Sequence, residues 1–187
     1  MSKRLEKKKI KALVAETLRN IHIPLDFHLE KTNVNMIYDF IQNKLIIDVE
    51  RLRKARKEMR KPVTLEAYVQ ALVLHETGHY LDQEALWESV QRTIEIHKKK
   101  REVPYFERAK DLELFQLDIE EHEMDYTFEE TAWRNAAKLN EKYGIVDEES
   151  FENVKFESLL SYTAVYNRDL LIYQSLLKED SGKHLAV

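Results

Sequence analysis

The sequence predicts an α+β fold that is predominantly helical. The chain has 187 residues but only three Gly and three Pro, where average usage would give about 13 and about 9. Gly and Pro are the residues that most often mark turns, so their scarcity favours long helices joined by few tight turns. Only residues 25–49 are rich in β-prone segments, and they suffice for a small sheet of two or three strands.

The N-terminal third carries both kinds of pattern. Residues 3–20 place their apolar side chains on one helical face, and Pro24 follows the end of that helix. A turn is expected at Gln42 and Asn43, between the last two β-prone segments, and residues 50–60 return to a helical pattern. The predicted strand segments are 27–29, 34–41 and 44–49.

The sequence pattern predicts a series of helices in the rest of the chain. Thr64 is placed to cap a largely apolar helix, and Gly144 stands where a helix C-terminus is expected. Ser181 and Gly182 are expected to stop the last helix. The predicted helices are 65–82, 84–101, 106–142 in two pieces around 125–127, and 148–178. No linker composition separates these parts, so we expect a single domain with an N-terminal part (1–62), a middle part (63–143) and a C-terminal helical region (144–187).

Composition excludes several classes of function. The chain has no Cys, which excludes disulfide scaffolds, Cys-ligated metal sites and cysteine nucleophiles. No run approaches the roughly 18 apolar residues of a membrane span, so we expect no membrane association. The basic N-terminus does not resemble a secretion signal. We therefore expect a cytoplasmic protein; the sequence does not indicate its oligomeric state.

Charge is distributed unevenly along the chain. Residues 1–62 contain 16 Lys/Arg and 8 Asp/Glu, whereas the remainder contains 14 and 26. The densest basic run could form a footprint for nucleic acid or for an acidic partner. No aromatic residue is interleaved with it, and the whole chain is acidic, which favours the solvated face of an exposed helix. The run consists of Arg51, Arg53, Lys54, Arg56, Lys57, Arg60 and Lys61.

The motif that carries chemistry is His75-Glu76-Thr77-Gly78-His79, an HExxH sequence within the helix expected at 65–82. Residues i and i+4 lie on one helical face, so both imidazoles point the same way. Two such histidines bind zinc in many hydrolases, and the glutamate between them acts as the general base. His75 and His79 are therefore the predicted metal ligands and Glu76 the predicted catalytic residue. Gly78 is unusual inside a helix, and it leaves room beside the metal or for a closely packed neighbouring segment.

A third protein ligand has to come from elsewhere. Position 85, where one branch of these enzymes has another His, is Ala85. A later helix carries Glu129, followed one turn on by small residues that allow a close approach. Glu130 is the competing candidate, but Thr127 and Glu130 also fit a capping box, which favours Glu129 as the ligand. Further alternatives are Asp82, Glu121, His122 and Asp125.

The HETGH sequence followed by Glu129 and Ala132 resembles the gluzincins, and among them the ImmA/IrrE-type metallopeptidases. In that family a small sheet precedes the HExxH helix, and the third ligand stands three residues before an Ala. The resemblance covers roughly residues 25–140. It implies a zincin-like fold, with the sheet packed on the HExxH helix, and a zinc ion as cofactor. Trp133 departs from the Asn that is usual after that Ala.

The resemblance also implies an enzyme, a zinc-dependent metallopeptidase that hydrolyses a peptide bond in a protein or peptide substrate, by analogy a regulatory protein. Glu76 would take a proton from water and return it to the leaving amine. Tyr162, Tyr166 and His184 are candidates for stabilising the oxyanion, and Asp82 for a hydrogen bond to an imidazole. Two other functions stay open: a non-catalytic zincin-like scaffold acting by protein interaction, and a nucleic-acid-associated helical module that uses the basic run.

Overall fold

The structure, a computed structural model, describes residues 3–184 and confirms an α+β fold that is predominantly helical. The described residues form seven helices and one three-stranded sheet. They divide into two compact units, each made of two separate stretches of chain. The first unit comprises Met1–Gln83 and Glu129–Ser158, and the second comprises Glu84–Phe128 and Leu159–Val187. These boundaries differ from the expected ones after residues 62 and 143, and the single domain stays a prediction.

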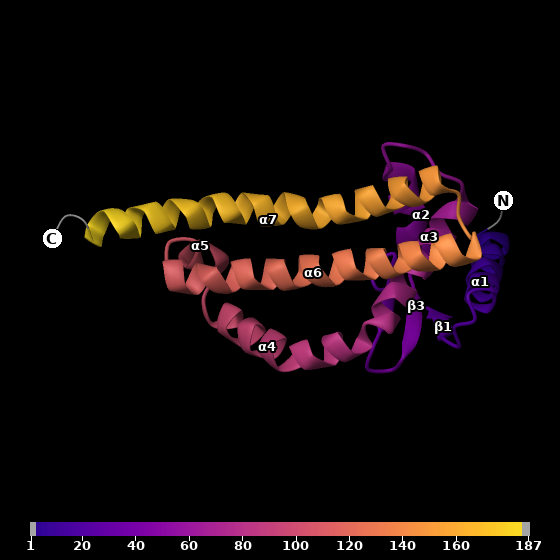
Figure 1. Cartoon of the computed structure of the whole chain (residues 1–187), viewed down its shortest axis with the longest axis horizontal. Coiled ribbons are helices and arrows are strands. Elements are labelled where there is room, and N and C mark those ends of the chain that lie inside the picture. Colours follow the sequence, from indigo (N-terminus) through magenta and orange to yellow (C-terminus); the bar gives the residue numbers. More distant parts are fainter. Residues whose placement is uncertain (1–2, 185–187) are drawn as a thin grey trace. The chain divides into compact units, whose positions relative to one another are not determined.

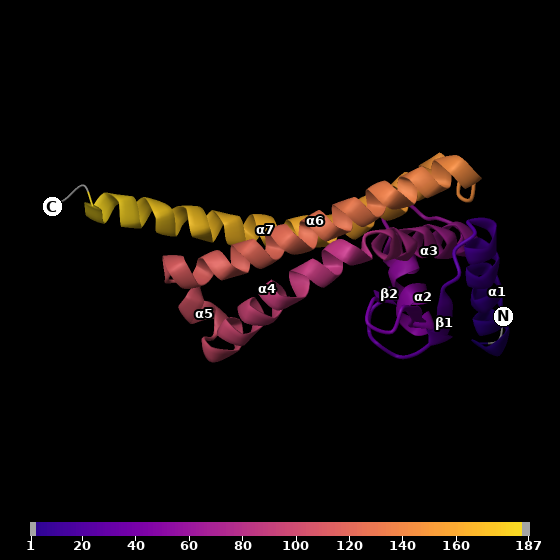
Figure 2. The ribbon, with the colours of Figure 1, turned by 60° about the horizontal axis from the view of Figure 1, so that its bottom comes forward.

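The first unit contains the sheet and the helices around it. Helix α1 (Lys3–Asn20) precedes strands β1 (Asp26–Leu29), β2 (Met36–Asp39) and β3 (Lys44–Ile47). The strand order is β1-β3-β2, with β1 parallel and β2 antiparallel to the central β3. Strand β2 is therefore an edge strand. Figure 2 shows these strands below α3 (Leu65–Leu81), with α1 beside them.

One face of the sheet is buried against the helices. The register pairs Met36 with Ile47 and Tyr38 with Leu45, and all four side chains are buried. Because side chains alternate across a strand, these four lie on the same face of the sheet. Helix α3 contacts both β2 and α1. The core of the first unit is therefore centred on α3, as the expected packing of the sheet on the HExxH helix requires.

Helix α3 begins where the sequence predicts. The Thr64 hydroxyl accepts a hydrogen bond from the Ala67 backbone N–H at 3.0 Å, which satisfies one of the unpaired N–H groups of the first turn. The helix ends at Leu81, with Asp82 as its C-cap. Most of its residues are buried on every side, so it runs through the core rather than along the surface.

The basic run lies mainly on α2 (Val49–Glu58) and is largely paired within the first unit. Its ion pairs join Arg53 to Glu6, Arg51 and Lys54 to Glu58, and Arg60 to Glu157. These contacts match the interpretation of a solvated helix face and leave fewer cations for an anionic partner.

The second unit contains α5 (Tyr105–Arg108), most of α4 (Gln83–Glu102), and parts of two long helices, α6 (Leu112–Tyr143) and α7 (Glu148–His184). Figure 1 shows α6 and α7 side by side. Buried charge joins these elements: the Arg108 guanidinium binds Asp118 through two hydrogen bonds, of 2.6 and 2.7 Å. The buried Asp169 carboxylate binds Tyr105 and His122, at 2.7 and 2.8 Å.

Two predicted helix boundaries are wrong. Helix α6 runs without a break through 125–127, and the interruption falls at 109–111 instead. The Thr127 hydroxyl donates to the Glu123 carbonyl oxygen at 2.7 Å, an interaction inside a helix rather than at a cap. The last helix also continues past Ser181 and Gly182. Within the described part of the chain, no helix is both long enough and apolar enough to cross a membrane.

Candidate metal centre

The two predicted histidine ligands lie one turn apart on α3. Their ring centroids are 4.8 Å apart and their planes meet at 72°. Both side chains are largely buried: that of His75 is 5% exposed and that of His79 is 14% exposed. The i, i+4 spacing places the two Nε2 atoms on the same side of the helix.

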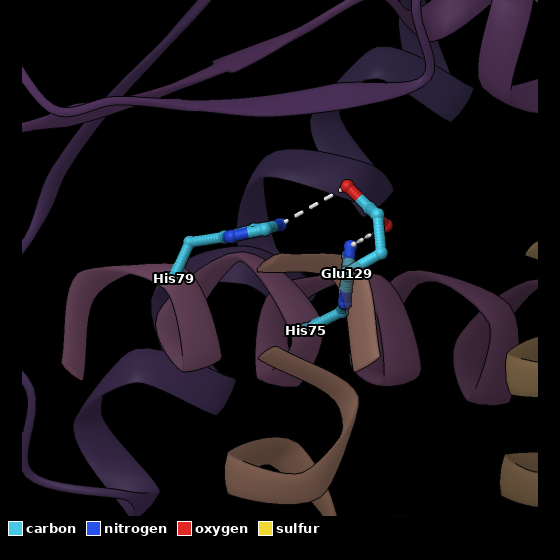
Figure 3. Close-up of side chains that lie close together, drawn as sticks. All are labelled: His75, His79 and Glu129. Carbon is cyan, nitrogen blue, oxygen red and sulfur yellow. Dashed lines mark ion pairs between the residues drawn. The ribbon is translucent and has the colours of Figure 1, made fainter. Parts of the chain in front are cut away.

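Glu129 on α6 faces both imidazoles, as Figure 3 shows. One carboxylate oxygen lies 3.2 Å from His75 Nε2, and the other lies 3.4 Å from His79 Nε2. Among the described residues, these three form the one group of His, Asp and Glu side chains arranged to hold a metal ion, with ligand atoms all within 4.8 Å of one another. The sequence therefore selected the carboxylate that the structure brings to the two histidines.

The close approach of α6 to α3 depends on small residues. At Gly78 a Cβ atom would meet the Ala132 carbonyl oxygen at 2.1 Å, a distance at which something must shift. The Asn135 side chain donates to the Gly78 carbonyl oxygen at 3.2 Å. Ala132 and Ala136 are fully buried. Of the two roles expected for Gly78, close packing of a neighbouring segment is the one that the structure shows.

Burial and mutual charge interactions shift the pKa values of Glu129 and His79. Burial by itself raises the pKa of the Glu129 carboxyl, but hydrogen bonds and charge from His75 and His79 outweigh it and lower that pKa well below its usual range. Burial by itself lowers the pKa of His79, but the hydrogen bond that its ring donates to Glu129 and the charges of Glu76, Glu129 and Asp82 raise that pKa overall. In the metal-free chain, a proton on His79 is therefore stabilised by Glu129.

Glu76 is buried beside this group and is tied to the edge of the sheet. The Tyr38 backbone N–H donates to its carboxylate at 2.8 Å. The Asp48 N–H donates to the Asn35 carbonyl oxygen, so these two residues form a hydrogen-bonded pair. Bonded and non-bonded pairs alternate along an antiparallel ladder, so Tyr38 and Leu45 form a non-bonded pair whose backbone groups point away from each other. The Tyr38 N–H therefore lies on the outer edge of β2 and is free to bind Glu76. Burial raises the pKa of the Glu76 carboxyl, opposed in part by His75 and His79.

Two His nitrogens and a carboxylate could hold a metal ion, and zinc takes ligands of these kinds. Zinc in proteins binds His nitrogen and carboxylate oxygen at about 2.0–2.2 Å in tetrahedral geometry, so neighbouring ligand atoms stand about 3.3 Å apart. The 3.2 and 3.4 Å separations each involve a different Glu129 oxygen, and one ligand atom from each residue falls within a group 4.8 Å across. Three protein ligands leave one coordination position for a water or substrate, as in catalytic zinc sites.

The alternative ligands have other contacts. Glu130 is exposed and lies 3.5 Å from Arg134, and Asp82 is the C-cap of α3, whose charge acts on the pKa of His79. In the second unit, Glu121 pairs with Lys100 and His122 with Asp169. Asp125 and Tyr162 also belong to that unit. Tyr166, a candidate for oxyanion stabilisation, donates to Glu123 at 3.1 Å, and the side chain of His184 lies outside the described residues.

Sequence reasoning missed two contacts of the centre. Trp133, noted only as a departure from the family pattern, stacks on the His75 ring with centroids 4.4 Å apart and planes at 19°. Its position four residues after Glu129 was a usable signal, because residues i and i+4 share a helical face. The Tyr38 contact to Glu76 comes from the main chain and leaves no signal in the residue type.

Comparisons of the chain with protein-family models, with curated proteins and with solved structures found no match.

Proposed function

We propose that this protein is a zinc-dependent metallopeptidase with a zincin-like active site. The observation that carries the proposal is the convergence of His75, His79 and Glu129, with Glu76 buried beside them. This donor set and this adjacent carboxylate are what metal-assisted peptide hydrolysis needs. The resemblance of HETGH and Glu129 to the ImmA/IrrE-type enzymes supports the same function, with a protein or peptide as substrate.

In this proposal His75, His79 and Glu129 hold the zinc ion. Zinc supplies Lewis acidity, which polarises a carbonyl group and makes a water molecule more acidic. Glu76 accepts the proton that the attacking water loses as its oxygen bonds to the scissile carbonyl carbon. When the C–N bond breaks, Glu76 gives that proton to the leaving amine. The Tyr38 N–H holds the carboxylate in place, and burial moves its pKa upward, towards the range that proton transfer requires.

The test uses the full chain and its Glu76→Gln variant. Metal analysis should give about one zinc ion per chain for both proteins, because Glu76 is not a ligand. Incubation with a peptide mixture derived from a proteome, read by mass spectrometry, should give new termini with the parent and none with the variant. Equal cleavage by both proteins would refute the role of Glu76. Zinc binding without cleavage by either would favour the non-catalytic scaffold.

A further inference from the structure

The His75 ring lacks the hydrogen bond that usually orients a metal-bound histidine. Metal-ligating histidines almost always donate their second ring N–H to a carboxylate, carbonyl or water, which fixes the ring orientation. The His75 Nδ1 atom is buried and has no hydrogen-bond partner among the described residues. Among the described residues, a packing contact is therefore what can hold the plane of this imidazole.

Trp133 supplies that contact through its aromatic face. The indole and the imidazole are nearly parallel, with centroids 4.4 Å apart, so the indole covers one face of the ring. The His79 ring also packs against His75, in an edge arrangement at 72°. The stacked indole opposes rotation of the imidazole about its χ2 bond, because rotation would drive the edge of the ring into the indole.

Trp133 is itself held rigidly. It is fully buried, and the Phe151 ring packs on it edge to face, with centroids 5.6 Å apart. The indole N–H has no hydrogen-bond partner among the described residues, although a buried Trp usually finds one. The indole therefore contributes here through its stacking on His75, a contact that a smaller apolar side chain would not make.

We propose that Trp133 is a positioning residue of the metal centre, which holds the His75 imidazole in its ligating orientation in place of a hydrogen-bonded partner. The proposal rests on the proposed zinc site. Helix α6 then contributes twice to the same ion: Glu129 as a ligand, and Trp133, one turn later on the same face, as the support for a second ligand.

The test compares three variants of the full chain. Trp133→Leu removes the aromatic face, Trp133→Phe keeps an aromatic face, and Leu52→Ala removes a buried side chain of α2 elsewhere in the same unit. Zinc affinity is measured by competition with a chromophoric chelator, and unfolding in urea reports how far each change destabilises the fold. The visible spectrum of the Co²⁺-substituted protein reports the geometry of the ligands.

Trp133→Leu should weaken zinc binding by about tenfold or more, the effect of removing an outer partner of a metal ligand, and should change the Co²⁺ spectrum. Trp133→Phe should restore most of the affinity and the parental spectrum. Leu52→Ala should leave both unchanged even where it destabilises the fold. Unchanged affinity in Trp133→Leu, or an equal loss in Leu52→Ala, would overturn the proposal. A parent chain that binds no zinc would instead refute the proposed function.

If Trp133→Leu does not fold, a fluorescence measurement that leaves Trp133 in place tests the proposal. The chain has two Trp residues, and the other, Trp87, is half exposed. A Trp87→Phe variant therefore leaves Trp133 as the single indole emitter. Zinc titration should change the fluorescence emission of Trp133, because His75, on which it stacks, becomes a metal ligand. The midpoint of this change should agree with the zinc affinity from chelator competition. Emission that stays constant while zinc binds would also overturn the proposal.

Discussion

The carbonyl oxygen of Ala132 lies so close to Gly78 that a methyl group at position 78 would stand 2.1 Å from it. This contact sets the distance between the helix that carries both histidines and the helix that carries Glu129. The glycine of the HExxH motif is thus part of the geometry of the centre, although its side chain is a single hydrogen.

Gly78→Ala should destabilise the first unit, although Ala is the better helix former by about 1 kcal/mol. The added methyl group overlaps backbone atoms, which cannot rotate away, and overpacking of this kind costs about 1–3 kcal/mol or more. It should also weaken zinc binding, because α6 must move away from α3. Urea unfolding and chelator competition measure the two effects. Gly144→Ala is the contrast: there a Cβ would meet no atom within 4 Å, and the strain comes from the positive φ of 61°.

Glu129→Gln should reduce zinc affinity by at least about 100-fold, since loss of an outer partner alone costs about 10–100-fold. The amide keeps the shape of the side chain but brings no negative charge to the ion. Glu130→Gln is the matched control: it is the next residue on the same helix, but it is exposed and paired with Arg134, so its substitution should leave the affinity unchanged. Equal losses in the two variants would refute the assignment of Glu129.

Zinc binding should release a proton and strengthen as pH rises. The pKa of His79 is raised in the metal-free chain, so below that pKa a proton must leave before the imidazole can bind zinc. Calorimetric titrations in two buffers with different ionisation enthalpies give the number of protons released. A binding constant independent of pH between about 5 and 8 would contradict this linkage.

The pKa shifts of His79 and Glu129 predict different pH dependences of the free energy of unfolding with and without zinc. A raised His79 pKa stabilises the metal-free fold fully below the unfolded value of about 6.5, and this contribution is lost as pH rises through the folded pKa. The lowered Glu129 pKa stabilises the fold above its unfolded value of about 4.3, and that contribution is lost as pH falls. In excess zinc, stability should instead increase as pH rises past the His79 pKa, because zinc binds more tightly. Urea unfolding with zinc and with a chelator compares the two.

Asp118→Asn should destabilise the second unit by about 3–5 kcal/mol, because it leaves the buried Arg108 guanidinium without its counter-charge. Glu120→Gln is the matched control: Glu120 also makes two hydrogen bonds to an arginine, Arg92, but that pair is 42% and 35% exposed. Exposed pairs contribute about 0–1 kcal/mol. Urea unfolding at neutral pH measures the difference, and similar losses would show that burial is not what gives the Arg108 pair its strength.

Lowering the pH should remove the difference in the free energy of unfolding between the parent chain and Asp118→Asn. Burial raises the pKa of Asp118, but hydrogen bonds from Arg108 and Lys100 outweigh it and lower that pKa overall. The ionised form therefore stabilises the fold above the unfolded value of about 3.9, and this contribution is lost as pH falls through the folded pKa. The two proteins should approach equal stability at the lowest pH at which both still fold.

The parts of the centre that follow from local sequence could be predicted. Thr64 caps α3 through its own hydroxyl, and the i, i+4 spacing of His75 and His79 needs nothing beyond the helix that carries it. The small residues that follow Glu129 pointed to this segment, but the preference for Glu129 over Glu130 rested on a capping box that the structure does not form. The division into two units could not be predicted, because α6 and α7 cross from one unit to the other without a change in composition.

The wrong predictions have a common cause, which is competition between local signals and helix continuity. Thr127 and Glu130 match a capping box, but inside a long helix the Thr127 hydroxyl bonds to Glu123 instead. Ser181 and Gly182 resemble a stop, and the Ser181 hydroxyl likewise bonds back to Leu177 within α7. A hydroxyl that can cap a helix can equally bond to the preceding turn, and the sequence does not distinguish the two.

The bond between the Tyr38 amide and Glu76 has a consequence for how this site can evolve. Every amino acid except proline offers the same N–H, so the residue type at position 38 can drift without loss of the contact. What cannot drift is the register of β2: a slip by one residue would turn the N–H of position 38 inward, towards β3. Selection to keep the Tyr38–Glu76 contact would thus act on the lengths of the loops on either side of β2, and insertions or deletions there would be rarer than substitutions.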